Sequence, residues 1–414
     1  MASEKNIEAP LGGIQTPDYC DSTDFSAQNA PVNTEKAPGE DQEVKDGGYG
    51  WVIVAAVCLI LAHSFGINSM FGVFLAFYLE SNTYPGATPL QFAFIGGLCF
   101  SIGAFISGAY IAASFSKTIW QLILSQGVCY GIGMGICFIG TASIVPQYFT
   151  KRRSLAVGIA TGGTGLGGLV YSLAANEMIH SRLGIEWTFR IMAIICFVVI
   201  TASALFLKDR NEKQKATVKV LEWKLFKMLD FWLFLGWLWL SSLGYVVVVF
   251  SLSAYAQEVG FSAEQGSLVS AMFNLSTGIG RPVIGLLCDK FGEIRVTSIG
   301  TLISTLITFF IWIFGGKTYG GLMVYGLLGL FPSLLWATFV VVAAKVFGLK
   351  MMPAAISLSI LTLSLPYTFA EAIGLSLRKS GPDGFLNVQI FAGAMFAAST
   401  VCCKSTCSCM PCNS

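Results

Sequence analysis

The sequence contains few charged residues for its length. Of its 414 residues, 12% are charged and 54% are hydrophobic. Soluble domains carry roughly 25% charged residues, so this composition cannot cover a water-exposed surface. The 45 glycines and the 13% of aromatic residues are of the types that pack and anchor membrane helices. The composition therefore predicts an all-α, polytopic membrane protein.

Histidine is almost absent, which excludes several catalytic classes. His63 and His180 lie far apart in the chain, and no group of histidine, aspartate and glutamate has the spacing of metal ligands. No catalytic triad is indicated either. A net charge of +2 offers no basic surface for nucleic acid. We therefore expect neither an enzyme nor a nucleic-acid-binding protein, and we expect no cofactor and no bound metal.

The cysteines form no disulfide pattern. Seven of the 12 are scattered, mostly in apolar segments, which argues against a disulfide framework. The other five lie within the last 13 residues, as Cys402, Cys403, Cys407, Cys409 and Cys412. Their spacing is poor for a metal site, and palmitoylation near the membrane is an alternative. We favour a third interpretation, an aberrant end produced by altered splicing.

Polar and apolar stretches alternate along the chain. Residues 1–46 are polar and acidic, which predicts a disordered cytosolic tail without a cleavable signal peptide. A basic cytosolic loop, 208–230, carries seven Lys/Arg residues and separates an N-terminal helix bundle (47–207) from a C-terminal one (231–403). A short Cys-rich tail (404–414) follows. Eleven segments have the length and apolarity to span a bilayer: 51–79, 91–115, 120–145, 154–178, 187–207, 231–256, 265–288, 296–314, 319–344, 352–376 and 385–403.

Five spans before the basic loop conflict with the charge pattern. Short loops rich in Lys/Arg stay in the cytoplasm, and Lys151, Arg152 and Arg153 lie on the same side as the basic loop. Three spans before Lys151 would place the acidic tail outside the cell, whereas four would keep it in the cytosol. Two spans do not fit between Phe92 and Trp120. We infer that about one helix and a loop are missing from the N-terminal half, as an altered isoform or gene model; sequencing the transcript tests this.

The stretch GRPVIGLLCDKFGEIR (280–295) carries a dense cluster of charges between two apolar spans. Asp289 lies at the C-terminal end of a predicted helix, which is unfavourable unless basic partners or the N-terminus of another helix compensate. Such a cluster can join two helices in one conformation and release them in another. The alternative is a basic turn that obeys the positive-inside rule. We call these residues the cytoplasmic latch: Gly285, Asp289, Lys290, Gly292 and Arg295, with Lys151, Arg152 and Arg153.

Arg281 is the clearest charge inside a predicted span. It lies about seven residues before the cytoplasmic end of its helix and is followed by Pro282. Charges within the membrane are costly and usually functional. A buried guanidinium recognises a carboxylate in planar, bidentate geometry. The alternative is a structural partner for Asn274 or for a helix carbonyl.

Two further motifs belong to the first half: one precedes its first span and the other connects two of its spans. DGGYGW comprises Asp46, Gly47, Gly48, Tyr49, Gly50 and Trp51; the glycines form a hinge and the aromatic residues are interfacial anchors or an ordinary aromatic belt. YFTKRRSLAVGIATGGTGLG (148–167) places glycines within three helical turns, which favours close helix packing.

The charged cluster resembles the cytoplasmic loop signature of the major facilitator superfamily. With the two motifs, residues 46–400 resemble the monocarboxylate-transporter family, most closely its fungal branch. The resemblance implies two six-helix bundles, a cytosolic N-terminus, and an anion-binding role for the arginine of the GRP motif, here Arg281.

The chain departs from that family at two positions. Proton-coupled members carry an aspartate one turn before the arginine, where this chain has Thr277. They also carry a lysine deep in the first helix, where this chain has Ser69 after Asn68. A proton-coupled lactate carrier is therefore doubtful. His63 and Glu371 remain candidates for proton coupling, although a structural histidine and a solvated carboxylate near the outer membrane surface are alternatives.

These features predict a secondary active transporter of a small organic anion, by alternating access at a site between the bundles. The predicted substrate-binding residues are Arg281, Asn274, Thr277, Asn68, Ser69 and His63. The alternatives are a riboflavin-like vitamin transporter, and a non-transporting protein, either a defective isoform or a nutrient sensor. We expect the lipid bilayer, a small anion or vitamin, and a proton as partners, and the need for an accessory subunit stays open. The plasma membrane is the expected location, with a vacuolar or other internal membrane as the alternative.

Overall fold

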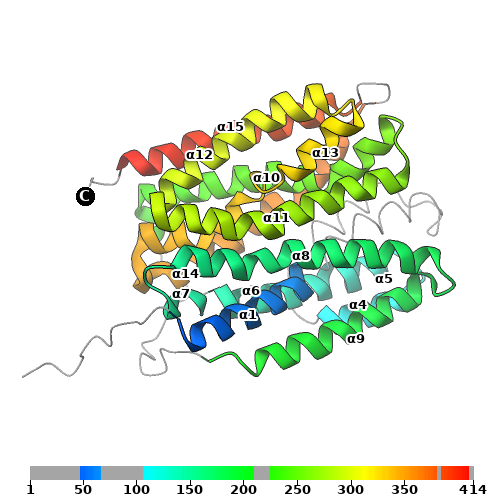
Figure 1. The fold of residues 1–414 in the computed structure, drawn as a ribbon, viewed down its shortest axis with the longest axis horizontal. Helices are drawn as coiled ribbons and strands as arrows, with labels where there is room; N and C mark the ends of the chain where they lie inside the picture. The colour runs from blue at the N-terminus through cyan, green and yellow to red at the C-terminus, as the bar shows by residue number, and fades with distance from the viewer. Residues whose placement is uncertain (1–46, 67–105, 143, 209–223, 380–383, 410–414) are drawn as a thin grey trace, which may run out of the picture. The chain divides into compact units, whose positions relative to one another are not determined.

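The computed structural model describes residues 47–66, 106–142, 144–208, 224–379 and 384–409 (Figure 1). In these ranges the chain is helical and contains no strand. The predicted all-α fold is therefore confirmed for the described part. Asp46, Asn68 and Ser69 lie outside the described residues, as do the acidic tail and most of the basic loop.

The N-terminal half contains the predicted spans that fall in the described ranges. Three of them, 120–145, 154–178 and 187–207, are confirmed. The helix was expected to be missing between Phe92 and Trp120, and residues 92–105 of this segment lie outside the described ranges, so the missing helix stays a prediction. The elements are α1 (Tyr49–Leu61) with η1 (Ala62–Gly66), α4 (Ile106–Ser114), α5 (Ile119–Leu122), η2 (Ile123–Cys129), α6 (Tyr130–Ala142), α7 (Val145–Tyr148), α8 (Arg153–His180) and α9 (Gly184–Ala204).

Five of the six spans predicted in the C-terminal half are continuous helical stretches, whereas the span predicted at 319–344 is interrupted between Leu327 and Leu334. Residue Gly348 has non-helical backbone angles (φ 69°, ψ 160°), so α14 consists of two helices that meet there. The last helix continues to Cys409, six residues beyond the predicted end. The elements are η3 (Leu225–Lys227), α10 (Leu229–Glu258), α11 (Ala263–Phe291), α12 (Glu293–Leu306) with η4 (Ile307–Gly315), α13 (Tyr319–Leu327), α14 (Leu334–Leu377) and α15 (Leu386–Cys409).

Local sequence fixes both ends of α11. At its start, Ser262 Oγ accepts a hydrogen bond from Gln265 N (3.2 Å), and Gln265 Oε1 accepts one from Ser262 N (3.0 Å). This reciprocal pair satisfies two backbone donors that the first turn would leave free. At its end, Gly292 adopts φ 92°, a conformation that side chains disfavour. Gly292 therefore forms a tight turn, and α12 starts immediately after it.

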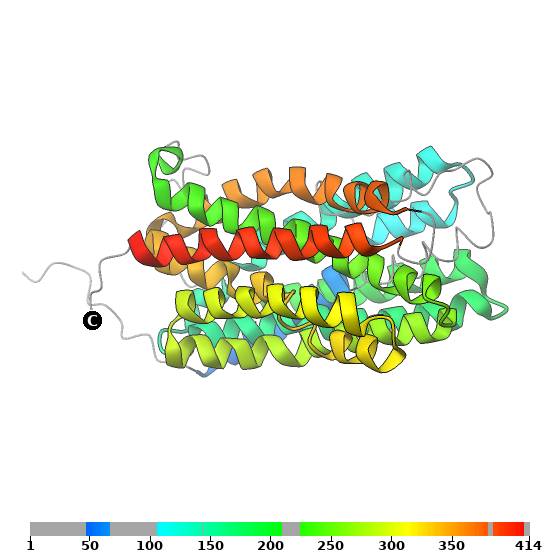
Figure 2. The same cartoon turned by 90° about the horizontal axis from the view of Figure 1, so that it is seen from above.

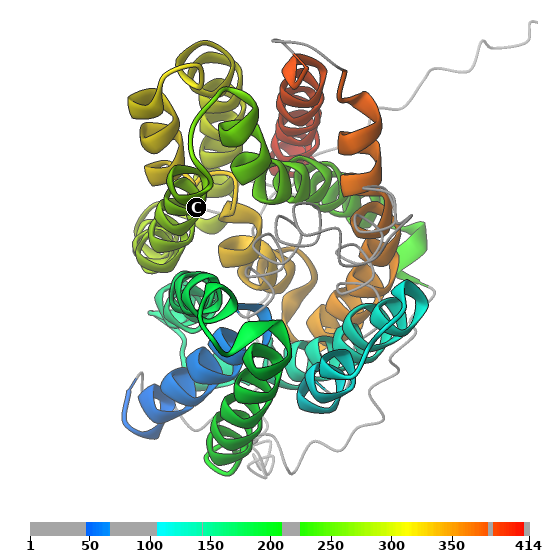
Figure 3. The ribbon, with the colours of Figure 1, turned by 90° about the vertical axis from the view of Figure 1, so that its right-hand side faces the viewer.

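Glycines bring α8 and α11 into backbone contact. A Cβ atom on Gly158 would lie 2.5 Å from the carbonyl oxygen of Arg281, and one on Gly165 would lie 2.3 Å from the amide nitrogen of Gly278. On its other side α8 contacts α1, where a Cβ on Gly163 would lie 2.2 Å from Cys58 O. Figure 1 shows α8 beside α11, and Figure 3, nearly end-on, shows α8 (teal) between α1 (blue) and α11 (yellow-green). The predicted close packing of the glycine-rich helix is thus confirmed.

Outward-facing apolar side chains agree with a membrane environment. Ile194, Phe197 and Phe310 are large apolar side chains on helices, and each is more than 60% exposed. Figure 2 shows α15 (red) lying beside α10 and α12, with one side uncovered. Seven of the described helical stretches are long and apolar enough to cross a bilayer. The chain is a multi-pass, all-α membrane protein.

Candidate functional site

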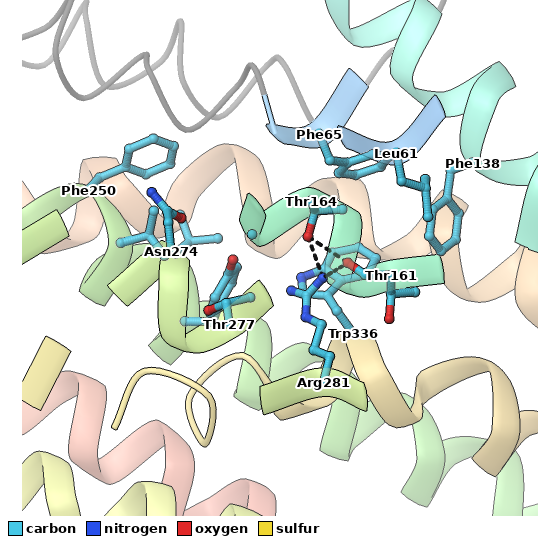
Figure 4. Close-up of a pocket in the computed structure, with 14 residues that line it drawn as sticks. Leu61, Phe65, Phe138, Thr161, Thr164, Phe250, Asn274, Thr277, Arg281 and Trp336 are labelled. Atoms are coloured by element: carbon cyan, nitrogen blue, oxygen red, sulfur yellow. Dashed lines mark hydrogen bonds between the residues drawn. The ribbon is translucent and has the colours of Figure 1, made fainter. Parts of the chain in front are cut away.

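A cavity lies where helices of the two halves meet (Figure 4). Most of its polar groups come from α8 and α11. Most of its apolar side chains come from α1, η1, α6, α10 and α14. The lining residues are Leu61, Phe65, Phe138, Thr161, Thr164, Gly165, Tyr245, Val246, Val249, Phe250, Asn274, Thr277, Arg281 and Trp336.

Arg281 is the one charged side chain among these lining residues, and it is 2% exposed. Its Nη1 donates hydrogen bonds to the backbone oxygen of Thr161 (2.7 Å) and to Thr164 Oγ1 (2.5 Å). Figure 4 shows the guanidinium directed toward these two threonines. The contact depends on the glycine-mediated approach of α8 and α11. It fixes the guanidinium at the polar side of the cavity.

The guanidinium of Arg281 has no counter-charge in the described part of the chain. Tyr245 forms a side-chain hydrogen bond with the guanidinium, and both Tyr245 and Tyr367 interact with it electrostatically. Its Nε is buried and has no hydrogen-bond partner among the described residues. Of the two structural alternatives, a helix carbonyl does accept from Arg281, but Asn274 does not contribute a hydrogen bond. One edge of the guanidinium is therefore anchored, while the Nε edge retains a free donor.

Two other predicted binding residues lie at the same cavity. Asn274 and Thr277 occupy the two turns of α11 that precede Arg281. Thr277 is 2% exposed, and its hydroxyl donates to Ser333 Oγ over 3.3 Å, which ties α11 to the start of α14. The structure thus brings three of the six predicted binding residues together.

His63 lies elsewhere. Its Nδ1 is 2.9 Å from the carbonyl oxygen of Leu59, one turn back along the same helix. Its ring stacks edge-to-face on Tyr171, with centroids 5.6 Å apart and an angle of 87°. It is not among the residues that line the cavity. The structure therefore places His63 in the packing between α1 and α8, and not beside Arg281.

Glu371 is buried within α14, 4% exposed. Its Oε2 has no hydrogen-bond partner among the described residues. The alternative of a solvated carboxylate is therefore wrong, because the side chain is buried although the helix ends only six residues later, at Leu377. Glu371 does not line the cavity either.

The latch residues form one contact between helices, through Asp289, and leave several charges exposed. Asp289 Oδ1 accepts from Ser154 N and Oδ2 accepts from Leu155 N, each over 2.9 Å. A Cβ on Gly285 would lie 2.4 Å from the carbonyl oxygen of Ser154, so α11 meets the first turn of α8 directly. The helix N-terminus compensates the carboxylate, as one of the predicted solutions requires.

The basic latch residues surround this contact. Lys151, Arg152, Lys290 and Arg295 are exposed. Arg153 is half-buried and its Nε donates to the carbonyl oxygen of Phe149 over 3.2 Å. The described structure thus joins α11 to α8 through a carboxylate and backbone amides.

The two N-terminal motifs contact each other. Trp51 stacks edge-to-face on Phe149, with centroids 4.9 Å apart. Tyr49 Oη donates to the carbonyl oxygen of Phe206 over 2.7 Å, and Tyr148 Oη donates to that of Lys208 over 2.8 Å. Both tyrosines therefore attach to the segment that follows α9, beyond what interfacial anchoring alone would require.

Several residues of the cavity were not predicted from the sequence, among them two threonines of α8 and three aromatic residues. Thr161 and Thr164 lie between the glycines of α8, and this alternation of small and polar residues was the available signal. Phe65, Phe138 and Trp336 gave no local signal, since aromatic residues are frequent throughout the chain.

Comparisons with known proteins agree with the fold. The profile of the Major Facilitator Superfamily matches residues 46–371. The chain is 31% identical to the "Probable transporter MCH2" of Saccharomyces cerevisiae over 392 residues, 87% of this chain and 82% of that protein. It is also 31% identical to the "Uncharacterized transporter ESBP6" of the same yeast, covering 89% of this chain but spanning only 60% of that protein. The "Aspyridones efflux protein apdF" of Emericella nidulans is 27% identical, over 89% of this chain and 80% of that protein.

Proposed function

Because the chain belongs to the major facilitator superfamily, we propose that it is a secondary active transporter of a small, monocarboxylate-like organic anion. One observation carries the choice of an anion. Arg281 is buried at the cavity and has no carboxylate partner in the described part of the chain. An unpaired buried charge is costly, and a bound anion offsets that cost.

The free edge of the guanidinium selects the type of anion. Nη1 is occupied by Thr161 and Thr164, whereas Nε has no partner among the described residues. The Nε and Nη2 donors of an arginine point in parallel, which matches the two oxygens of a carboxylate. Asn274 and Thr277 supply further polar groups along the same helix. An uncharged vitamin such as riboflavin would leave the guanidinium unpaired, so the carboxylate is preferred.

Alternating access requires that α8 and α11 separate at the end that carries the basic residues. Asp289 holds the two helices together there through two hydrogen bonds. In our proposal the described conformation is closed at this end, which the positive-inside rule makes the cytoplasmic side. Breaking the Asp289 contact opens the cavity toward the cytosol, at the plasma membrane in the simplest case.

Proton coupling is assigned to Glu371 in this proposal. It is a buried carboxylate whose Oε2 has no partner in the described ranges, whereas His63 is held by Leu59 and Tyr171. A carboxylate without a counter-charge in the membrane is expected to bind a proton readily.

Uptake of labelled carboxylates into proteoliposomes tests the proposed function. Both directions are to be measured, because one relative is named an efflux protein. We expect Arg281→Gln to lower substrate affinity roughly 30-fold or more, since truncating one partner of a buried charge pair costs about 2–5 kcal/mol. Arg190→Gln is the matched control, because Arg190 pairs with Glu186 on α9 away from the cavity. Unchanged uptake by Arg281→Gln would remove this residue from the site.

An imposed pH gradient tests the coupling. We expect proton-driven accumulation in the native protein and only substrate exchange, without accumulation, in Glu371→Gln. The amide keeps the shape of the carboxyl group but cannot carry a proton. If Glu371→Gln still accumulates substrate against its gradient, the coupling group is another residue.

A further inference from the structure

The cavity has two chemically distinct walls. Thr161 and Thr164 on α8, with Asn274, Thr277 and Arg281 on α11, form a polar wall with a single charge. The facing wall comes from α1, η1, α6, α10 and α14 and is apolar except for one tyrosine hydroxyl. Its residues are Leu61, Phe65, Phe138, Tyr245, Val246, Val249, Phe250 and Trp336. A ligand that fills this cavity needs one anionic end and an apolar body.

Three aromatic rings form a triangle within the apolar wall. The centroids of Phe65 and Phe138 lie 5.5 Å apart, and those of Phe138 and Trp336 lie 5.6 Å apart. Phe65 and Trp336 close the triangle at 5.9 Å. The interplanar angles of these three pairs, in the same order, are 62°, 78° and 57°, so no two of the rings are parallel. Such an arrangement presents both the negative face and the positive edge of an aromatic ring to a ligand.

The triangle is connected to the charged residue. Trp336 contacts Tyr367 with centroids 6.0 Å apart, and Tyr367 interacts electrostatically with Tyr245 and Arg281. The three rings and Arg281 all line the same cavity. Figure 4 shows Phe65 and Phe138 on the side of the cavity opposite the backbone of Arg281. A ligand bound by the guanidinium therefore meets the rings within the same cavity.

We propose that the substrate is an aromatic monocarboxylate. Its carboxylate binds the Nε edge of Arg281, and its ring lies against Phe65, Phe138 and Trp336. A small aliphatic acid would gain no ring–ring contact with these three side chains, whereas an aromatic body gains edge-to-face contacts beyond its buried area. This inference rests on the proposed anion transport and specifies the class of anion.

The same arrangement relates binding to the two halves of the protein. Phe65 and Phe138 belong to helices before the basic loop, and Trp336 belongs to a helix after it. Arg281, also after the loop, is anchored to Thr161 and Thr164 before it. The ring of an aromatic anion therefore contacts both halves, so its departure removes contacts between them.

Ligand titrations by thermal shift on the purified protein test the proposal. The probes are phenylacetate and cyclohexylacetate, which share the carboxylate and the six-carbon ring but differ in aromaticity. We expect phenylacetate to bind roughly three- to tenfold more tightly, from the usual strength of aromatic pairs. Trp336→Leu should bring this ratio close to one, and Phe138→Leu should lower it. Trp336→Phe keeps a ring and should retain most of the preference.

Exposed aromatic residues provide the matched controls. Trp232→Leu and Phe310→Leu alter side chains that are 54% and 62% exposed and do not line the cavity, so they should leave the ratio unchanged. Equal affinities for the two probes, with binding still lost in Arg281→Gln, would overturn the aromatic preference and leave anion transport standing. A ratio that survives both Trp336→Leu and Phe138→Leu would show that the triangle only packs the core. Absence of any Arg281-dependent anion binding would defeat the proposed function itself.

Discussion

Two charged residues of α11 meet the same neighbouring helix in different ways. Asp289 reaches the first turn of α8, where two backbone amides donate to its two oxygens. Arg281 lies eight residues earlier, about 12 Å along the helix. It reaches the interior of α8, where a carbonyl oxygen and a hydroxyl accept from Nη1 while Nε has no partner in the described ranges.

The difference follows from helix geometry. The first amides of a helix lack intrahelical acceptors, so a carboxylate at that place satisfies them and meets the positive end of the dipole. Within a helix the backbone groups are already paired with each other. A guanidinium there finds a carbonyl oxygen or a hydroxyl as an acceptor, but no opposite charge. Asp289 is thus satisfied by the fold, whereas Arg281 keeps an Nε donor without a partner in the described ranges, which in our proposal binds an anion. The comparison predicts that one residue governs the conformation and the other governs affinity.

Changing Gly158 should disturb both residues and have the largest effect. A Cβ there would lie 2.5 Å from the carbonyl oxygen of Arg281, an atom of the backbone that cannot move aside as a side chain can. We expect Gly158→Ala to destabilise the protein by roughly 1–3 kcal/mol, as overpacking does, and to lower transport. Thermal denaturation in detergent measures the loss. Gly320→Ala is the control, because a Cβ there meets nothing within 4 Å; equal stability of the two variants would contradict a tight α8–α11 contact.

Changing Asp289 should separate conformation from affinity. Asp289→Asn keeps the size of the side chain but loses the charge and one acceptor. We expect the closed state to lose about 1–2 kcal/mol, as when a helix cap is removed, and the substrate affinity of that state to be retained. Thermal stability and binding titrations are the measurements. Glu177→Gln, an exposed acid in the last turns of α8, should change neither. A loss of affinity without a loss of stability would argue against the assigned role.

Long, regular features were predictable from the sequence. Five of the six C-terminal spans form continuous helical stretches, and the close packing of the glycine-rich α8 was confirmed, because length, apolarity and glycine spacing act locally. Arg281 was recognised as a buried charge for the same reason: an ionised group within an apolar run has few acceptable environments.

Contacts between distant helices were not predictable. His63 and Arg281 are both polar residues in apolar runs, yet His63 faces Tyr171 and Arg281 faces the cavity. The rotation of each helix about its axis decides this, and a single sequence does not specify that rotation when both faces are apolar. The aromatic triangle depends on three helices at once, so Phe65, Phe138 and Trp336 gave no signal before the fold was known.

The smallest of these effects is expected at Thr164, which tests whether Arg281 needs its anchor on α8. Thr164→Val preserves the shape of the side chain and removes one of the two described acceptors of Nη1, while the carbonyl oxygen of Thr161 remains. A single hydrogen bond contributes about 0.5–1.5 kcal/mol, so anion affinity should fall roughly two- to tenfold. Thr201→Val, on an exposed position of α9, is the control. Tighter binding in Thr164→Val would mean that the threonine competes with the substrate for the guanidinium instead of orienting it.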